Sequence, residues 1–132
     1  MGRRELREQI FLLLFRVEFN ELSEMPEQMQ LFLADDETAR KPEDADYIVK
    51  KYDKIMEKLP AIDEQLEKKA ENWNVARMGK VELTILRLAV YEIEYDEDVP
   101  TGVAINEAVE LAKKFGQESA GSFVNAVLAK FV

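Results

Sequence analysis

The chain has 132 residues, which suits one domain with one core, and its 5 Gly and 4 Pro are too few to separate the strands of a sandwich or barrel. It contains no Cys and no His, which excludes disulfides, thiolate zinc sites and a catalytic Cys and removes the most common general base. The net charge of -9 argues against a protein that coats nucleic acid electrostatically. We therefore expect a protein that is not an enzyme and that has no catalytic residues, metal site or cofactor.

The first third of the chain predicts two helices. Residues 3–19 predict the first, because apolar side chains recur three and four positions apart along it. Ser23 is the expected N-cap of a short second helix, which contains Pro26 in its first turn and extends to about Leu33. The polar residues 34–41 predict a loop.

The middle of the chain predicts two further helices on either side of a proline. Pro42 suits the first turn of a helix, and we expect Pro60 to end this helix and to open the next. Asn72 and Asn74 indicate a break around Trp73, whose side chain we expect in the core.

The most apolar helix of the chain is predicted over residues 76–95, and a helix this apolar is expected to be central. A turn at residues 99–102 separates it from a helix over residues 103–115. Gly116 follows at the position where helices commonly take a left-handed residue.

A last helix begins at Ser119 or Ser122. The pattern as a whole predicts six or seven helices, and it contains no strand signal, internal repeat or linker. We therefore expect an all-α fold, a compact helical bundle that forms one domain over residues 1–132.

The charge is unevenly distributed. Residues 1–17 hold four basic and two acidic side chains, residues 18–99 hold 11 and 22, and residues 100–132 hold three of each. Any phosphate contact should therefore start from the first helix, whereas the acidic middle suits a basic protein partner or simply solubility.

No apolar run approaches the roughly 18 residues that a membrane-spanning helix needs. The longest run, residues 10–15, is also short for a signal peptide and is followed by Arg16 and Glu18. We expect a cytoplasmic protein without a membrane segment.

The second half of the chain resembles the NusB transcription antitermination family over roughly sixty residues. The resemblance begins at Trp73 and Arg77 and continues through Leu-Arg-Leu-Ala-Val-Tyr-Glu at residues 86–92. It extends through Val-Ala-Ile-Asn-Glu-Ala-Val-Glu-Leu-Ala-Lys-Lys-Phe-Gly at residues 103–116 and Ser-Phe-Val-Asn-Ala-Val-Leu at residues 122–128. This resemblance implies an all-helical fold of two packed helical subdomains.

The resemblance also implies a function. It implies binding of boxA-like single-stranded RNA in ribosomal RNA leader transcripts, together with NusE, which is also a small-subunit ribosomal protein. It further implies that this complex joins RNA polymerase in an antitermination complex and helps it to resist termination.

Two sets of residues match the positions through which this family contacts RNA. Arg3, Arg4 and Arg7 match its arginine-rich start, and guanidinium groups bind phosphates and stack on unpaired bases. Without the resemblance, a solvated helix end would be the simpler interpretation. Ser119, Ser122 and Phe123 match the family's last interhelical turn, where Phe123 either stacks on a base or belongs to the core.

Phe15 and Glu82 correspond to positions on the family's face for NusE. Glu82 suits a basic ribosomal protein, although an exposed carboxylate without a partner is an equally good interpretation. Arg87 lies within a strongly apolar helix, so we expect it to pair with a carboxylate or to cap a helix end.

Two alternatives stay open. A related helical domain forms the RNA-binding part of ribosomal RNA cytosine methyltransferases. Those enzymes need a Rossmann-like domain with a glycine-rich loop and a catalytic Cys, and the sequence has neither, so under this alternative the chain is the RNA-binding domain fragment of such an enzyme. The net charge of -9 also allows a protein-only adaptor that has no affinity for RNA.

Overall fold

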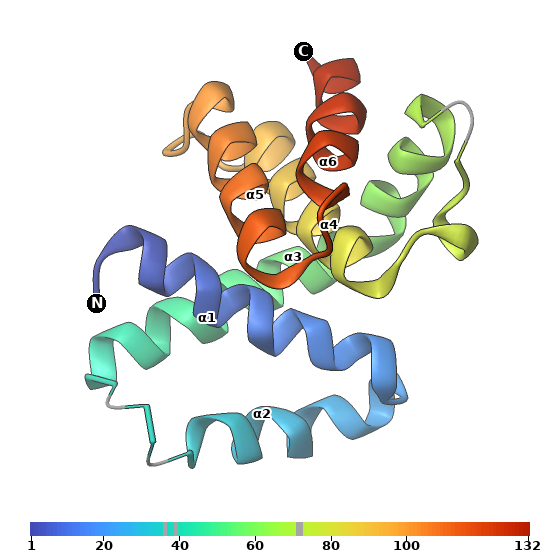
Figure 1. The fold of residues 1–132 in the computed structure, drawn as a ribbon. Helices are drawn as coiled ribbons and strands as arrows, with labels where there is room; N and C mark the ends of the chain where they lie inside the picture. The colour runs from blue at the N-terminus through green and yellow to red at the C-terminus, as the bar shows by residue number, and fades with distance from the viewer. Residues whose placement is uncertain (36, 39, 71–72) are drawn as a thin grey trace. The chain divides into compact units, whose positions relative to one another are not determined.

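The structure is a computed structural model that describes residues 1–35, 37–38, 40–70 and 73–132. Within these ranges the chain forms six α-helices and four short 3-10 helices and no strand, so the predicted all-α class is confirmed. The chain divides into two compact units, Met1–Lys54 and Ile55–Val132, each of which is described by itself (Figure 1). None of the helices in the described ranges is both long and apolar enough to cross a membrane.

The first unit contains α1 (Arg3–Phe15), α2 (Met25–Leu33) and the first part of α3 (Pro42–Lys69). The expected first helix changes character at its end, because Arg16–Phe19 form a 3-10 helix and the Asn20 amide donates to the Arg16 carbonyl oxygen at 2.8 Å. The core of this unit includes the buried side chains of Ile10, Phe11, Leu13, Leu14, Phe32, Ile48 and Tyr52.

Ser23 is not the N-cap of α2, so that prediction is wrong. Residues Leu22–Glu24 form a 3-10 helix of their own, and Glu24 occupies the N-cap position of α2. The Glu21 backbone N–H donates to Glu24 Oε1 at 2.8 Å, a contact that belongs to the capping box of this 3-10 helix. Pro26 lies in the first turn of α2 as predicted.

Pro60 does not end a helix, and this prediction is also wrong. The α3 helix continues through Pro60 to Lys69, so that one helix replaces the two that were expected. A proline in a helix removes a hydrogen bond and crowds the preceding turn, which costs about 3 kcal/mol. Ile55, Ile62 and Leu66 are each 0% exposed on the same helix, and their burial offsets this cost.

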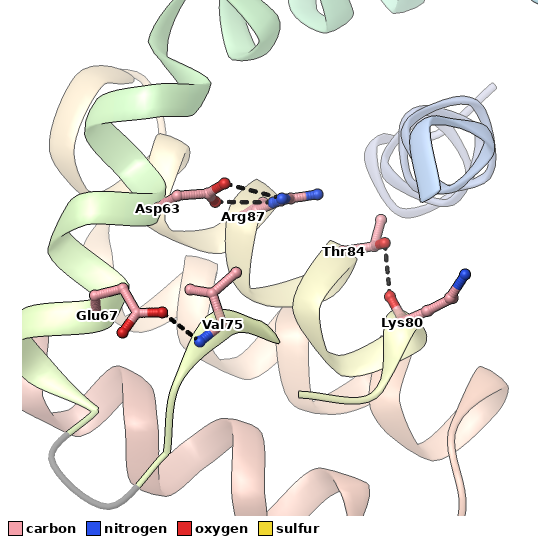
Figure 2. A network of polar contacts seen from close by, with 6 residues as sticks. All are labelled: Asp63, Glu67, Val75, Lys80, Thr84 and Arg87. Atoms are coloured by element: carbon pink, nitrogen blue, oxygen red, sulfur yellow. Dashed lines mark hydrogen bonds and ion pairs between the residues drawn. The ribbon is translucent and has the colours of Figure 1, made fainter. Parts of the chain in front are cut away.

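The second unit contains the last part of α3 together with α4 (Lys80–Tyr95), α5 (Thr101–Phe115) and α6 (Ala120–Leu128). The last three helices pack against one another (Figure 1). Every residue of α4 from Leu83 to Glu92 is buried, which confirms the prediction of a central helix. The buried Thr84 hydroxyl donates to the Lys80 carbonyl oxygen at 2.7 Å, so its polar group is satisfied within the helix (Figure 2).

Gly116 ends α5, but not in the left-handed conformation that was predicted. Its φ of -96° and ψ of 180° are extended, and any residue adopts such angles. Glycine is required here because a side chain would collide with neighbouring atoms. A Cβ at this position would lie 2.5 Å from the Ala120 Cβ and 2.8 Å from the Ala112 carbonyl oxygen.

Trp73 is not a core residue, because 53% of its surface is exposed. The predicted break around it is present, since α3 ends at Lys69 and the Asn74 side chain accepts from the Arg77 N–H at 2.9 Å. This contact caps a 3-10 helix over Val75–Arg77. Asn72, the other residue expected to mark the break, lies outside the described residues.

Candidate nucleic-acid interface

The start of α1 presents Arg3 and Arg4 to solvent. The amino group of Met1 donates to Asp44 Oδ2 at 3.1 Å, which ties this end of the helix to the first turn of α3 within the same unit. Arg3 and Arg4 are therefore carried on an anchored helix end, where backbone N–H groups also favour anions.

Arg7 differs from these two arginines because it is only 9% exposed. A buried guanidinium is stable only with polar partners in the protein, so this side chain belongs in large part to the folded unit. Arg3 and Arg4 are therefore the accessible members of the three, and Arg7 is the buried one.

Arg40 fastens the segment before α3 to both other helices of the first unit. Its Nε and Nη2 donate to Gln9 Oε1 at 3.0 and 2.7 Å, and its Nη1 donates to the Phe32 carbonyl oxygen at 3.1 Å. The guanidinium also lies 4.3 Å from the Phe32 ring centroid. Burial holds the pKa of the Arg40 guanidinium below its ordinary value, and the nearby charge of Asp35 offsets part of this lowering. This cluster links α1 to α2 through the segment before α3.

The start of α6 carries the second set of predicted RNA-binding residues. Ser119 occupies the N-cap position, but its side chain makes no capping hydrogen bond, and the Phe123 N–H donates to the Ser119 carbonyl oxygen at 3.1 Å. Ser119 and Ser122 are exposed and Phe123 is half-buried. The two hydroxyl groups and the aromatic ring thus lie within one helical turn.

Phe123 pairs with Trp73. Their ring centroids are 5.1 Å apart, and the ring planes meet at 75°, which is an edge-to-face arrangement. Sequence reasoning missed Trp73 as a site residue because a lone Trp is usually core. The signal that it overlooked is the polar and basic sequence on both sides of this residue.

Phe15, a predicted contact for the partner protein, is the middle ring of three. It stacks on Phe11 with centroids 5.7 Å apart and meets Phe19 edge to face at 5.0 Å. Phe11 is buried, Phe15 is half-buried and Phe19 is 59% exposed, so the row passes from the core to the surface. Phe19 was missed, although its four-residue spacing from Phe15 was visible in the sequence.

Glu82 lies half-buried in the first turn of α4. Its carboxylate folds back over Gly79, where it occupies the space that a Cβ would need. An acidic side chain at this end of a helix is stabilised by the backbone N–H groups. Glu82 therefore has a structural role in α4 in addition to the negative charge that it displays.

The structure places the predicted residues in separate groups. Arg3, Arg4, Arg7 and Phe15 belong to α1 in the first unit, whereas Glu82 and the residues around Phe123 belong to the second. In the described part of the chain, no three acidic side chains are arranged to hold a metal ion.

The helices, the exposed arginine and aromatic side chains and the half-buried Glu82 define a small all-α protein whose candidate sites suit the binding of a macromolecule. The pattern of the NusB family matches residues 4–132 of the chain. The transcription antitermination protein NusB of Agathobacter rectalis is 50% identical over 131 residues, which is 99% of each chain. The NusB protein of Lachnoclostridium phytofermentans is 51% identical over 132 residues, which is 100% of this chain and 99% of the relative.

Solved structures agree with these relatives. NusB of T. maritima superposes with a TM-score of 0.86 at 32% identity, covering 98% of this chain and 89% of that one. A chain from the crystal structure of the antitermination factors NusB and NusE in complex with dsRNA gives a TM-score of 0.82 at 29% identity, covering 96% and 92%. The chain belongs to the NusB family of transcription antitermination proteins and is not an enzyme.

Proposed function

We propose that this protein binds boxA-like single-stranded RNA in ribosomal RNA leader transcripts together with NusE. In this role it acts in the cytoplasm as part of an RNA polymerase antitermination complex. Membership of the NusB family supports the proposal, as does the similarity to a complex that contains NusE and RNA. The observation that carries it is the exposure of Arg3 and Arg4 at an anchored helix start in a chain of net charge -9.

The chemistry of the first unit fits this ligand. Guanidinium groups bind phosphate oxygens with paired hydrogen bonds and stack on unpaired bases. Two exposed arginines are a small electrostatic footprint, so we expect modest affinity for RNA from the protein alone. A basic partner that contributes its own phosphate contacts would raise the affinity of the complex.

The chain also carries two features that suit such a partner. Phe15 and the exposed Phe19 offer apolar surface in the first unit, and aromatic side chains are enriched at protein interfaces. Glu82 offers negative charge in the second unit. We assign both features to NusE.

The experiment is a titration of fluorescently labelled boxA RNA with the protein, in the presence and absence of NusE. We expect measurable binding that tightens with NusE. In a variant that combines Arg3→Gln and Arg4→Gln, RNA affinity should fall and NusE affinity should not. The matched control combines Lys50→Gln and Lys54→Gln, which removes the same charge from exposed positions of α3 and should leave RNA affinity nearly unchanged. NusE binding without any RNA binding would favour the protein-only adaptor instead.

A further inference from the structure

Trp73 is an exposed aromatic residue that contacts Phe123. It is 53% exposed, and it meets Phe123 at an interplanar angle of 75° with centroids 5.1 Å apart. In an edge-to-face pair, one ring is contacted on a single face and the other only along its edge. Whichever role Trp73 takes, Phe123 leaves at least one face of the indole uncovered.

Hydrogen bonds hold the backbone at Trp73 and at Val75. The Trp73 N–H donates to the Ala70 carbonyl oxygen at 2.9 Å. After the tryptophan, the Val75 N–H donates to Glu67 Oε1 at 2.6 Å, a contact that joins this segment to α3 (Figure 2). An indole on an anchored backbone loses little conformational entropy on binding, which favours its use as a contact residue.

The sequence around Trp73 is basic. Residues 68–80 hold four basic side chains and one acidic side chain, a net charge of +3 within a chain of net charge -9. Lys68, Arg77 and Lys80 are exposed, and Lys69 lies with its Nζ 4.5 Å from the Phe131 ring centroid. Positive charge was predicted from the sequence only for the first helix. The charge was summed over residues 18–99, and the 22 acidic side chains of that region outweigh the basic side chains of this shorter segment.

We propose that Trp73 is a base-stacking residue, which together with Phe123 forms an aromatic platform for an unpaired RNA base. The inference rests on the proposed RNA-binding function and extends its site to a residue outside α1 and α6. The ligand chemistry follows from the surroundings. An aromatic face accepts any base, the net positive charge of residues 68–80 attracts phosphates, and the exposed hydroxyls of Ser119 and Ser122 lie next to Phe123 in the same turn.

RNA fits this surface better than a protein does. Exposed aromatic residues also occur at protein interfaces, but a basic partner protein would meet like charge from residues 68–80. Single-stranded RNA supplies negatively charged phosphates, which complement residues 68–80, and unpaired bases, which can stack on Trp73.

Trp73 is the only tryptophan of the chain, so its intrinsic fluorescence reports on this position alone. Titration of the full protein with unlabelled single-stranded boxA RNA should quench the emission in parallel with binding, which is followed separately by the anisotropy of labelled RNA. The same sequence closed into a duplex should quench less, because its bases are already stacked. Unchanged tryptophan emission at saturating RNA would overturn the proposal while leaving RNA binding itself established.

Variants provide the second measurement. Trp73→Ala should weaken RNA binding about 5- to 100-fold, the range expected for the loss of one stacked base. Trp73→Phe should restore most of the affinity, since it keeps an aromatic face. The matched control is Tyr47→Ala, which removes an aromatic side chain that is 46% exposed in the other unit and should not change RNA affinity.

The outcomes separate this inference from the proposed function. RNA affinity that is unchanged in Trp73→Ala, in a protein whose wild-type form binds RNA, contradicts the stacking role only. Weaker NusE binding with unchanged RNA affinity would assign Trp73 to a protein interface and likewise contradict it. A wild-type protein that binds no RNA contradicts both proposals. Circular dichroism of each variant checks that the fold is retained.

Discussion

Arg87 and Asp63 form a two-point ion pair between α4 and α3 within the second unit. Arg87 Nε donates to Asp63 Oδ1 and Nη2 donates to Oδ2, each at 2.9 Å (Figure 2). The Arg87 side chain is 11% exposed and that of Asp63 is 29% exposed. The pairing confirms the expectation that Arg87 meets a carboxylate, and it joins the buried stretch of α4 to α3.

Asp63→Ala should lower the free energy of unfolding by about 2–4 kcal/mol, because it removes the carboxylate that pairs with a largely buried guanidinium. Replacing both residues, with Asp63→Leu and Arg87→Met, should recover most of this loss, since no unpaired charge remains. Urea denaturation of the single and double variants measures both quantities.

The control is an exposed ion pair within α3, the helix that carries Asp63. Lys68 and Glu64 lie 3.0 Å apart with side chains that are 72% and 67% exposed. Glu64→Ala should therefore change the free energy of unfolding by less than about 0.5 kcal/mol. If Asp63→Ala costs no more than Glu64→Ala, then the Arg87 pair has no special structural role.

Gly116 and Gly121 should respond in opposite ways to alanine. Gly116→Ala places a Cβ 2.8 Å from the Ala112 carbonyl oxygen, so the helix end must shift, at a cost of about 1–3 kcal/mol. A Cβ at Gly121 would make ordinary contacts, 3.7 Å from Val109 Cγ1 and 3.8 Å from Lys113 Cγ. Gly121→Ala should therefore stabilise α6 by about 0.5–1 kcal/mol. Denaturation midpoints test the pair, and equal effects would contradict the steric explanation of Gly116.

Pro60→Ala should raise the stability of the protein by about 1–3 kcal/mol. The Pro60 side chain is exposed, so alanine loses no packing and regains a backbone hydrogen-bond donor within α3. The greater freedom of the unfolded chain offsets part of the gain. Ala61→Gly at the adjacent exposed position should lower stability by about 1 kcal/mol, which checks that this turn reports on helix propensity. A neutral or destabilising Pro60→Ala would mean that the proline supports a bend that packing requires.

The errors at Pro60, Gly116 and Trp73 share a physical origin. Local rules treat proline as a helix end, glycine after a helix as left-handed, and a lone tryptophan as core. At Pro60 and Gly116 the packing of nearby residues decides instead. Burial of Ile62 and Leu66 carries α3 through its proline, and the close approach of Ala112 and Ala120 explains the glycine.

The predictions that succeeded rest on long periodic patterns. The apolar residues of α4 predicted a central helix, and the structure buries all of Leu83 to Glu92. The candidate site was only partly accessible to this reasoning. Sequence spacing placed Arg3, Arg4 and Arg7 on one helix end, but the difference in exposure between Arg7 and the other two depends on neighbours distant in sequence.

Glu82 offers a test of the partner surface that separates charge from folding. Glu82→Lys should weaken NusE binding more than Glu82→Gln does, because it introduces repulsion toward a basic protein. Both changes should also cost about 0.3–1 kcal/mol of stability, since the acidic side chain in the first turn of α4 is lost. Glu94→Lys, at an exposed position of the same helix, is the matched charge reversal and should not affect NusE binding. Equal binding by Glu82→Lys and the wild type would remove Glu82 from the interface.

The salt dependence of RNA binding should distinguish the exposed arginines from the buried one. Each phosphate neutralised in single-stranded RNA contributes roughly 0.7 to the slope of log K against log salt, so losing two contacts should flatten the slope by about 1.4. We expect this change for Arg3→Gln combined with Arg4→Gln, with less than about 1 kcal/mol of stability lost because both side chains are exposed. Arg7→Gln should instead lower the free energy of unfolding by more than 1 kcal/mol, since Arg7 is 9% exposed and its packing within the fold is disturbed. Thermal unfolding and a salt series on each variant provide the measurements. If the double variant keeps the full slope, the start of α1 does not contact RNA phosphates, and the basic segment around Trp73 becomes the remaining candidate.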